Sequence, residues 1–290
     1  MKLIVKFNLV LLMVFLLGMA ATAYVSHELL HANARSEIRE NARILMDSAL
    51  AVRKYTSEQI KPLLETQMKY EFLPQSVPSY SATEYFSEIH RKFPEYSYKE
   101  AALNPTNPRD RAADWEADIV HAFRSDDAKT EVFGERDTPN GRTLFLARPL
   151  KIKDPACLLC HSTVEIAPKT MLDKYGTANG FGWNLNETIG AQVVSVPMQV
   201  PIERANNAFK VFMALFGMVF AFLFVSMNLL LWLLVVRPVN RLARIADQVS
   251  LGDMDAPEFV VKGRDEIARL GESFNRMKKS LVQAFKMISG

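Results

Sequence analysis

Two long apolar runs constrain this chain more than any other feature of its sequence. The first extends from Phe7 to Val25, and the second, from Val211 to Val236, has only Ser226 and Asn228 as clearly polar members. Each run is long enough to cross the hydrocarbon core of a bilayer as a helix. Helices inside soluble domains rarely stay apolar on all sides for so many turns. We therefore expect two membrane-spanning helices.

The first run has a second interpretation, as a cleavable signal peptide. Basic residues precede it, and the small residues Ala21-Thr22-Ala23 stand near its end, as in a secretory signal. However, its apolar stretch is long for such a signal, and the sequence that follows continues as a helix. We favour an uncleaved anchor.

Charges beside the runs predict the orientation of the chain. Lys2 and Lys6 precede the first run, and Arg237, Arg241 and Arg244 follow the second. Positive flanks mark the cytoplasmic side, so we expect both termini in the cytoplasm. The expected division is a first span at 1–25, an outer domain at 26–208, a second span at 209–236 and a cytoplasmic module at 237–290.

The net charge of +3 is divided unevenly along the chain. The outer segment holds 22 Lys and Arg against 25 Asp and Glu, whereas residues 237–290 hold 10 against 7. The basic excess therefore belongs to the cytoplasmic part and the flanks of the spans. It indicates topology, and it argues against a nucleic-acid partner.

Both cysteines fall in the pentapeptide Cys157-Leu158-Leu159-Cys160-His161. C-x-x-C-H is the attachment site of c-type haem. At this spacing two thiols reach the two vinyl groups of one porphyrin, and the adjacent imidazole can bind the iron. The motif predicts one covalent haem c, with Cys157 and Cys160 as thioether residues and His161 as an axial ligand. Bacteria attach such haem outside the cytoplasmic membrane, which agrees with the expected topology.

Other roles for the two cysteines are less well supported. A disulfide would be compatible with an oxidising compartment. A thioredoxin-like redox pair would need a βαβ setting, which the sequence lacks. A structural zinc site would need about four nitrogen or sulfur ligands, and there is no second pair of cysteines.

The sequence does not identify the ligand on the far side of the iron. His27 and His31 lie one helical turn apart, but we expect them at the membrane interface. Several aromatic residues could line a flat cofactor or simply form the core: Trp115, Phe145, Tyr175, Phe181 and Trp183. The candidates for the second ligand, by residue type alone, are Met46, Met68, Met171, His90 and His121.

The outer segment has the pattern of an α+β domain. One long amphipathic helix is expected over residues 27–61, ending or bending at Pro62. Its apolar or small positions are Ala34, Ile38, Leu45, Val52 and Tyr55. A strand is expected at 96–101, followed by a helix that Asn107 caps, with Pro108 at its first position. Trp115, Ile119 and Phe123 form the apolar side of that helix. The remaining expected elements are a hairpin of 129–136 and 142–152 around residues 139–141, a helix at 168–174 and a strand at 189–200.

The tail carries two short runs of apolar residues at spacings of three and four. The first contains Leu242, Ile245 and Val249; the second contains Ile267, Leu270, Phe274, Met277 and Leu281. A connector with Gly252, Pro257 and Gly263 separates them. Two short heptad helices cannot bury their apolar sides alone, so the tail predicts a homodimer.

Residues 237–285 resemble a HAMP linker, the parallel four-helix module that follows the last span of bacterial sensors. The resemblance rests on Arg237-Pro238, the glycine-containing connector and Asp265-Glu266 at the start of the second helix.

Residues 35–200 resemble PAS-like periplasmic sensor domains that carry one covalent haem c. The resemblance implies an antiparallel sheet with a long N-terminal helix, thioether roles for Cys157 and Cys160, and the axial role for His161. Some such domains use a cysteine as the second axial ligand. A third cysteine does not exist here, so His/Met, His/His or one-sided ligation remains open. The motifs that carry the resemblance are Tyr98-Lys99-Glu100, Asn104 to Pro108, Trp115-Glu116, Cys157 to His161, Ala167-Pro168, Gly180-Phe181-Gly182-Trp183 and Val196-Pro197. The candidate haem-pocket residues within them are Tyr98, Asn104, Trp115, Phe181 and Trp183.

Together these features predict a dimeric haem c sensor in the bacterial inner membrane that responds to redox state or a small ligand. A membrane-anchored monohaem cytochrome carrying electrons to a respiratory partner is the alternative. A peroxide-consuming enzyme is disfavoured because no distal His/Arg pair can be assigned, and no catalytic residue is predicted. No kinase, cyclase or methyl-accepting segment follows the tail, so the output is expected from a separate kinase, regulator or redox partner.

Overall fold

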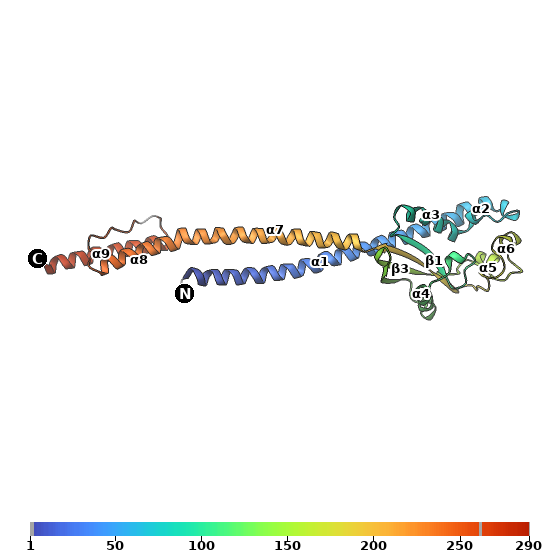
Figure 1. The fold of residues 1–290 in the computed structure, drawn as a ribbon, viewed down its shortest axis with the longest axis horizontal. Helices are drawn as coiled ribbons and strands as arrows, with labels where there is room; N and C mark the ends of the chain where they lie inside the picture. The colour runs from blue at the N-terminus through green and yellow to red at the C-terminus, as the bar shows by residue number, and fades with distance from the viewer. Residues whose placement is uncertain (1–2, 261–262, 290) are drawn as a thin grey trace. The chain divides into compact units, whose positions relative to one another are not determined.

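The computed structural model describes residues 3–260 and 263–289. The chain divides into two compact units (Figure 1). One unit is His27–Ala208, and the other combines the residues up to Ser26 with those from Phe209 onward. Two helices contribute to both units: α1 (Leu3–Tyr55) and α7 (Gln199–Leu231).

A four-stranded antiparallel sheet forms the centre of the outer unit, with strand order β1-β4-β3-β2. In the register, Ser195 of β4 lies between Ser97 of β1 and Phe145 of β3. With the long helix beside the sheet, this is the α+β, PAS-like architecture that the sequence predicts. The strands are β1 (Ser97–Ala102), β2 (Val132–Thr138), β3 (Gly141–Lys151) and β4 (Thr188–Pro197).

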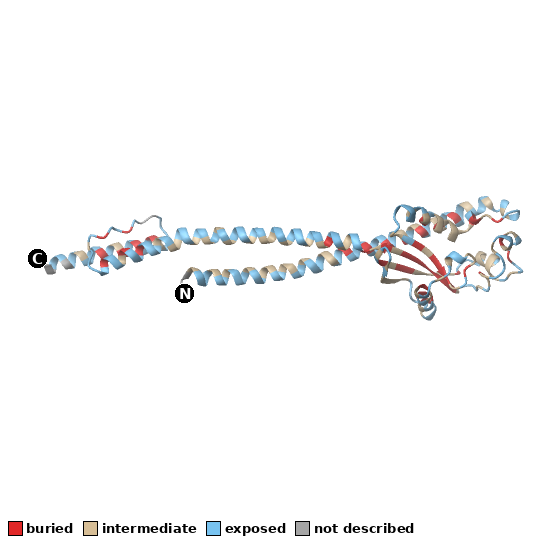
Figure 2. Ribbon diagram, viewed as in Figure 1, coloured by how far each residue is buried: buried red, intermediate tan, exposed pale blue. Residues whose placement is uncertain are grey.

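Helices pack on both faces of this sheet (Figure 2). Ala42 and Met46 of α1 are buried against β3 and β4, and Phe86 of α3 closes the same core. On the other face, Phe123 of α4 packs against strand residues of β3 and β4. The remaining elements of this unit are η1 (Thr56–Ile60), α2 (Lys61–Leu64), η2 (Gln67–Lys69), η3 (Pro74–Ser76), α3 (Pro78–Lys92), η4 (Pro108–Asp110), α4 (Asp114–Ser125), η5 (Pro155–Cys157), α5 (Leu158–His161) and α6 (Lys169–Tyr175).

The apolar stripe of α1 agrees with the sequence only in part. Ala34 and Ile38 are buried as expected, whereas the side chain of Tyr55 is 53% exposed. The small residues between them, such as Ala42 and Ala49, complete the buried side. Small residues allow the helix to approach the sheet closely.

One further expectation needs correction. The side chain of Asn107 accepts a hydrogen bond from the Arg109 amide and caps the short η4, while the α-helix begins only at Asp114. There the Glu116 carboxylate accepts the Ala113 amide at 2.8 Å. The structure also contains α3, an amphipathic helix that the sequence analysis did not identify.

Pro62 does not end the long helix but widens it. The amide of Lys61 donates to the carbonyl of Thr56, which makes η1 a π-helical turn just before the proline. The same arrangement recurs at η6 (Trp232–Val236), where the amide of Arg237 donates to Trp232 just before Pro238. Proline has no amide hydrogen and crowds the preceding turn, which explains why both distortions lie at an X-Pro bond.

The second unit contains the apolar parts of both long helices. By length and composition, two helical segments, Ile4–Leu64 and Gln199–Ser250, contain a stretch able to cross a membrane, and neither stretch is buried within the chain. The ring centroids of Phe15 and Phe220 lie 4.6 Å apart, so the two apolar stretches contact each other.

The tail forms two amphipathic helices, α8 (Arg237–Ser250) and α9 (Glu266–Ser289). The side-chain amide of Asn275 bonds both the amide and the carbonyl of Phe259 in the connector, at 3.0 and 2.8 Å. Leu270 and Met277 remain half exposed. They border an apolar groove of about 440 Å³ between the helices. The small core of this module consists of Leu242, Ile245, Val249, Ala256, Phe259 and Phe274.

Candidate haem-binding site

The C-x-x-C-H pentapeptide lies in a tight turn directly after β3. Asp154 begins the turn, because its carboxylate accepts the amide of Ala156 at 2.8 Å. The chain then forms η5 and the single helical turn α5. Cys157 and Cys160 are both half-buried and are not joined to each other. Residues three apart share one side of a helical turn, so the two thiols lie on the same side of the motif.

The imidazole of His161 is held in a defined orientation. Its Nδ1 lies 2.8 Å from the carbonyl oxygen of Gly180. Burial lowers the pKa of His161, which favours the neutral ring. A carbonyl can only accept a hydrogen bond, so the proton resides on Nδ1 and the lone pair on Nε2. A backbone carbonyl on the second nitrogen is the arrangement typical of metal-binding histidines.

The segment from Gly180 to Trp183 surrounds this imidazole. The indole of Trp183 stacks on the imidazole, with centroids 3.9 Å apart and planes at 16°. The amide of Trp183 donates to the carbonyl of His161 at 3.2 Å, and that of Gly182 donates to Ser162 at 2.8 Å. The ring therefore cannot rotate freely.

A glycine is required at position 180. Its φ is +87°, and a Cβ there would collide with the side chain and Cα of Thr106. The side chain of Asn104 bonds both the Gly180 amide, at 3.3 Å, and the Phe181 carbonyl, at 3.4 Å. The 104–106 turn thus locks the segment that orients His161.

These side chains fit a covalently attached haem. Burial raises the pKa of both Cys157 and Cys160, so both are thiols at neutral pH in the chain without a cofactor. Among the residues that the structure describes, no group of three His, Cys, Asp or Glu side chains is arranged to hold a metal ion. Two thiols, an imidazole with a free Nε2 and a fixed ring orientation match the donor set that haem c requires.

The candidates for a second axial ligand are dispersed. Met46 of α1 is buried in the core against the sheet, and His121 is exposed on α4. His90 uses Nδ1 on the carbonyl of Tyr96 at 2.8 Å. Met68 and Met171 belong to two elements in contact, η2 and α6, because the hydroxyl of Thr170 donates to the carbonyl of Met68 at 3.4 Å.

The predicted pocket residues divide into two groups. Asn104, Phe181 and Trp183 belong to the segments around His161. Tyr98 lies instead in the core beneath α1 and α3. Trp115 lies on the α4 face of the sheet, with its ring centroid 5.3 Å from that of Phe145.

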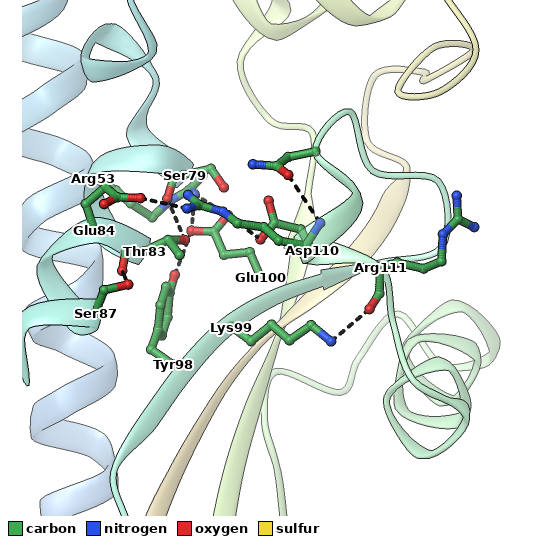
Figure 3. Close-up of polar contacts among 12 residues, drawn as sticks. Arg53, Ser79, Thr83, Glu84, Ser87, Tyr98, Lys99, Glu100, Asp110 and Arg111 are labelled. Carbon is green, nitrogen blue, oxygen red and sulfur yellow. Dashed lines mark hydrogen bonds and ion pairs between the residues drawn. The ribbon is translucent and has the colours of Figure 1, made fainter. Parts of the chain in front are cut away.

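A buried polar network connects the long helix to the sheet, and the sequence analysis did not identify it (Figure 3). The guanidinium of Arg53 on α1 lies 2.5 Å from both carboxylate oxygens of Glu100 on β1. The hydroxyl of Tyr98 donates to the same carboxylate at 2.6 Å, and Gln192 donates to that hydroxyl at 3.1 Å. Glu100 is only 2% exposed, so an unpaired charge here would be strongly unfavourable.

The charges in this network affect the pKa of a cysteine in the C-x-x-C-H motif. Burial disfavours the charged form of Arg53, but the Glu100 carboxylate and Tyr98 together outweigh burial and raise the pKa of Arg53. Burial raises the pKa of Tyr98 well above its ordinary value, with Glu100 acting in the same direction. The pKa of Cys157 is raised by burial and Asp154, and the positive charge of Arg53 opposes that rise. Arg53, a polar residue that interrupts the apolar side of α1, was the sequence feature from which this buried network could have been predicted.

The fold is a PAS-like domain connected by a helix able to span a membrane to a HAMP module. The chain belongs to the Tll0287-like family, which matches residues 31–197, and the HAMP domain matches residues 230–283. Proteins named heme sensor protein HssS, from Staphylococcus aureus strains JH9 and Newman, are 29% identical over 111 residues. That alignment covers 38% of this chain and 24% of each relative, so the chain spans about a quarter of their length.

One solved structure is also similar. The cyanobacterial heme-protein Tll0287 is 15% identical, with a TM-score of 0.38. The alignment covers 58% of this chain and 94% of that protein.

Proposed function

We propose that this protein is a haem c sensor of the bacterial inner membrane. The proposed division is an anchor at 1–25, a periplasmic haem domain at 26–208, a second span at 209–236 and a cytoplasmic HAMP module at 237–290, with both termini cytoplasmic. The fixed imidazole of His161, beside two thiols at haem spacing, is the observation that carries the proposal. The name of the HssS relatives, heme sensor protein, supports it over the aligned part.

In this proposal Cys157 and Cys160 hold the porphyrin by thioether bonds, and Nε2 of His161 binds the iron. A haem bound here supplies an iron that changes oxidation state or takes up a small ligand. Gly180, Thr106 and Trp183 keep the imidazole oriented, and Asn104 keeps their segment in place. The protein then acts as a receptor, and no residue of the site is assigned a catalytic role.

The long helix carries the response toward the membrane. Arg53 ties α1 to β1 through Glu100, and α1 continues without a break back through the first apolar run. A change near the C-x-x-C-H motif that alters this ion pair displaces the helix relative to the sheet. Such a signal requires two packings that the haem stabilises differently.

A second copy of the chain completes the HAMP module in this proposal. The groove bordered by Leu270 and Met277 leaves apolar surface on both tail helices uncovered within one chain. Parallel packing of two copies would bury it. The output then belongs to a separate kinase or regulator that contacts the paired helices.

Purified holoprotein tests the cofactor directly. The full chain is expressed together with haem-attachment machinery, and we expect an alkaline pyridine spectrum of haem c and a peptide containing residues 157–161 heavier by one haem. Cys157→Ala and Cys160→Ala should each weaken covalent retention, and His161→Ala should change the spin state. Two unmodified thiols in the mature protein would end the proposal.

The rival function is a membrane-anchored electron carrier. The exposed side chain of Leu159 favours it, because the edge of a haem attached at this motif would be accessible to a redox partner. Cysteines introduced on α8 and α9 distinguish the two functions. A crosslinking rate that differs between oxidised and reduced protein supports the sensor. Equal rates, combined with fast electron exchange with a redox partner, support the carrier.

A further inference from the structure

The outer unit contains a cavity of about 630 Å³ that is separate from the candidate haem site. Its lining comes from α3, β1, η4, the start of α4, the hairpin of β2 and β3, and β4. The lining includes no residue of the C-x-x-C-H motif and none of the segment 180–183. Its volume lies within the range typical of small-molecule sites.

The floor of the cavity is an uncovered part of the sheet. Arg136 of β2 lies opposite Thr143 of β3, and Ser195 of β4 lies opposite Ser97 of β1. The helix α4 packs farther along the same face, on the apolar strand residues around Val193. The polar end of this face therefore lines the cavity and is left uncovered by α4.

Among the described residues of the lining, most charged groups are paired, whereas Arg136 and Glu95 form no ion pair. Lys99 bonds Glu116 at 2.7 Å, Arg109 bonds Glu84 at 2.6 Å, and Arg91 bonds Glu88 at 2.8 Å. In the described residues, no carboxylate lies within ion-pair distance of Arg136. Its neighbour Glu135, on the other face of β2, pairs with Arg142 and Arg35.

Arg136 is held in place without a charged partner. Its guanidinium carbon lies 4.0 Å from the ring centroid of Trp115, a cation–π contact that fixes the side chain. The hydroxyls of Ser97 and Ser195 also make no hydrogen bond with any described residue. A half-buried guanidinium with unused donors, in a cavity that is also lined by unused hydroxyls, is arranged for an anion with planar geometry.

We propose that this cavity binds a small organic monocarboxylate, with Arg136 forming the bidentate ion pair and Ser195 donating a further hydrogen bond. The negative lining groups Glu95, Asp110 and Glu116 disfavour a second carboxylate on the ligand. The cavity would give the protein a chemical input in addition to the one proposed at His161. It depends on residues of the sheet and not on the bound haem.

Isothermal titration of the full haem-loaded chain in detergent micelles tests this site. The probes are benzoate and hexanoate, with benzamide and hexanamide as neutral counterparts. We expect saturable heat from at least one carboxylate and none from the amides. The Soret band should remain unchanged, which separates this site from ligand exchange at the iron.

Two arginines of the same lining provide the matched comparison. Arg136→Gln should weaken carboxylate binding at least tenfold, whereas Arg91→Gln should leave it unchanged, because Arg91 already pairs with Glu88 on the surface. Ser195→Ala should weaken carboxylate binding several-fold. This variant replaces Arg136→Gln as the test if Arg136→Gln lowers the melting temperature of the protein. Absence of saturable heat from both carboxylates, equal binding of the amides, or unchanged affinity in both Arg136→Gln and Ser195→Ala would overturn the proposal.

Discussion

Nδ1 of His161 donates a hydrogen bond to the carbonyl of Gly180, and this contact determines which nitrogen of the imidazole is left free. The partner carbonyl belongs to a glycine at a φ of +87°, pressed against Thr106. The orientation of one candidate iron ligand therefore depends on a backbone conformation 19 residues later in the chain.

Gly180→Ala is expected to disturb this arrangement. An alanine at positive φ is strained, and its Cβ would also displace Thr106, so we expect a loss of about 1–3 kcal/mol in the free energy of unfolding. The amount of haem attached per chain, from the Soret absorbance, should fall as well. Thermal unfolding by circular dichroism measures the first effect.

Gly182→Ala is the matched control for that change. Gly182 has a similar φ of +81°, but a Cβ there would meet nothing within 4 Å. It should show the backbone strain alone, of about 1 kcal/mol, with normal haem content. Equal haem loss in both variants would show that contact with Thr106 is unimportant.

Glu100→Gln is expected to destabilise the outer unit strongly. The substitution leaves Arg53 without its counter-charge in a buried position, so we expect a loss of about 3 kcal/mol. Glu84→Gln breaks a pair with Arg109 whose side chains are 36% and 46% exposed, and it should cost at most about 1 kcal/mol. Melting temperatures of the two variants, compared in the same detergent, check this difference.

Stability should fall with rising pH through Asp110. Burial raises its pKa to about 6, with Glu100 contributing and Arg109 opposing. The folded protein then binds the proton more tightly than the unfolded chain, so this contribution is complete below pH 4 and is lost as pH rises through 6. Relative to Asp110→Asn, the parent should lose about 1 kcal/mol between pH 5 and pH 8. If the melting temperatures of both proteins changed equally with pH across that range, the raised pKa of Asp110 would be contradicted.

Leu270→Glu should prevent pairing of the tail. Leu270 is 51% exposed at the apolar groove, where a charge would become buried on association. Light scattering with size-exclusion chromatography should show a shift from dimer to monomer. Glu272→Gln, on an exposed part of the same helix, should remain dimeric.

Local patterns in the sequence were sufficient for much of the fold. Periodic apolar residues predicted α1, α4 and the tail helices, and the Pro-Asn-Gly turn predicted the hairpin of β2 and β3. The amphipathic α3 was overlooked because no large apolar run or cap marks it. Asn107 was expected to cap an α-helix, but a cap residue does not determine the length of the turn that follows.

Long-range contacts explain most of what the sequence could not provide. Arg53 and Glu100 are 47 residues apart, and each alone resembles a solvent-exposed charge. The C-x-x-C-H motif was recognisable locally, whereas the Gly180 carbonyl that orients its histidine is visible only once the 104–106 turn packs on it.

The two π-helical turns beside Pro62 and Pro238 determine the rotational phase of the helices that follow them. Each turn accommodates about one residue more than an α-helical turn, and one residue corresponds to about 100° of rotation. Deleting a single residue within 232–236 would therefore remove the extra residue of this turn while keeping α8 on its present side. The same deletion a few residues earlier, within regular α7, would instead turn the apolar side of α8 by more than a quarter of a revolution.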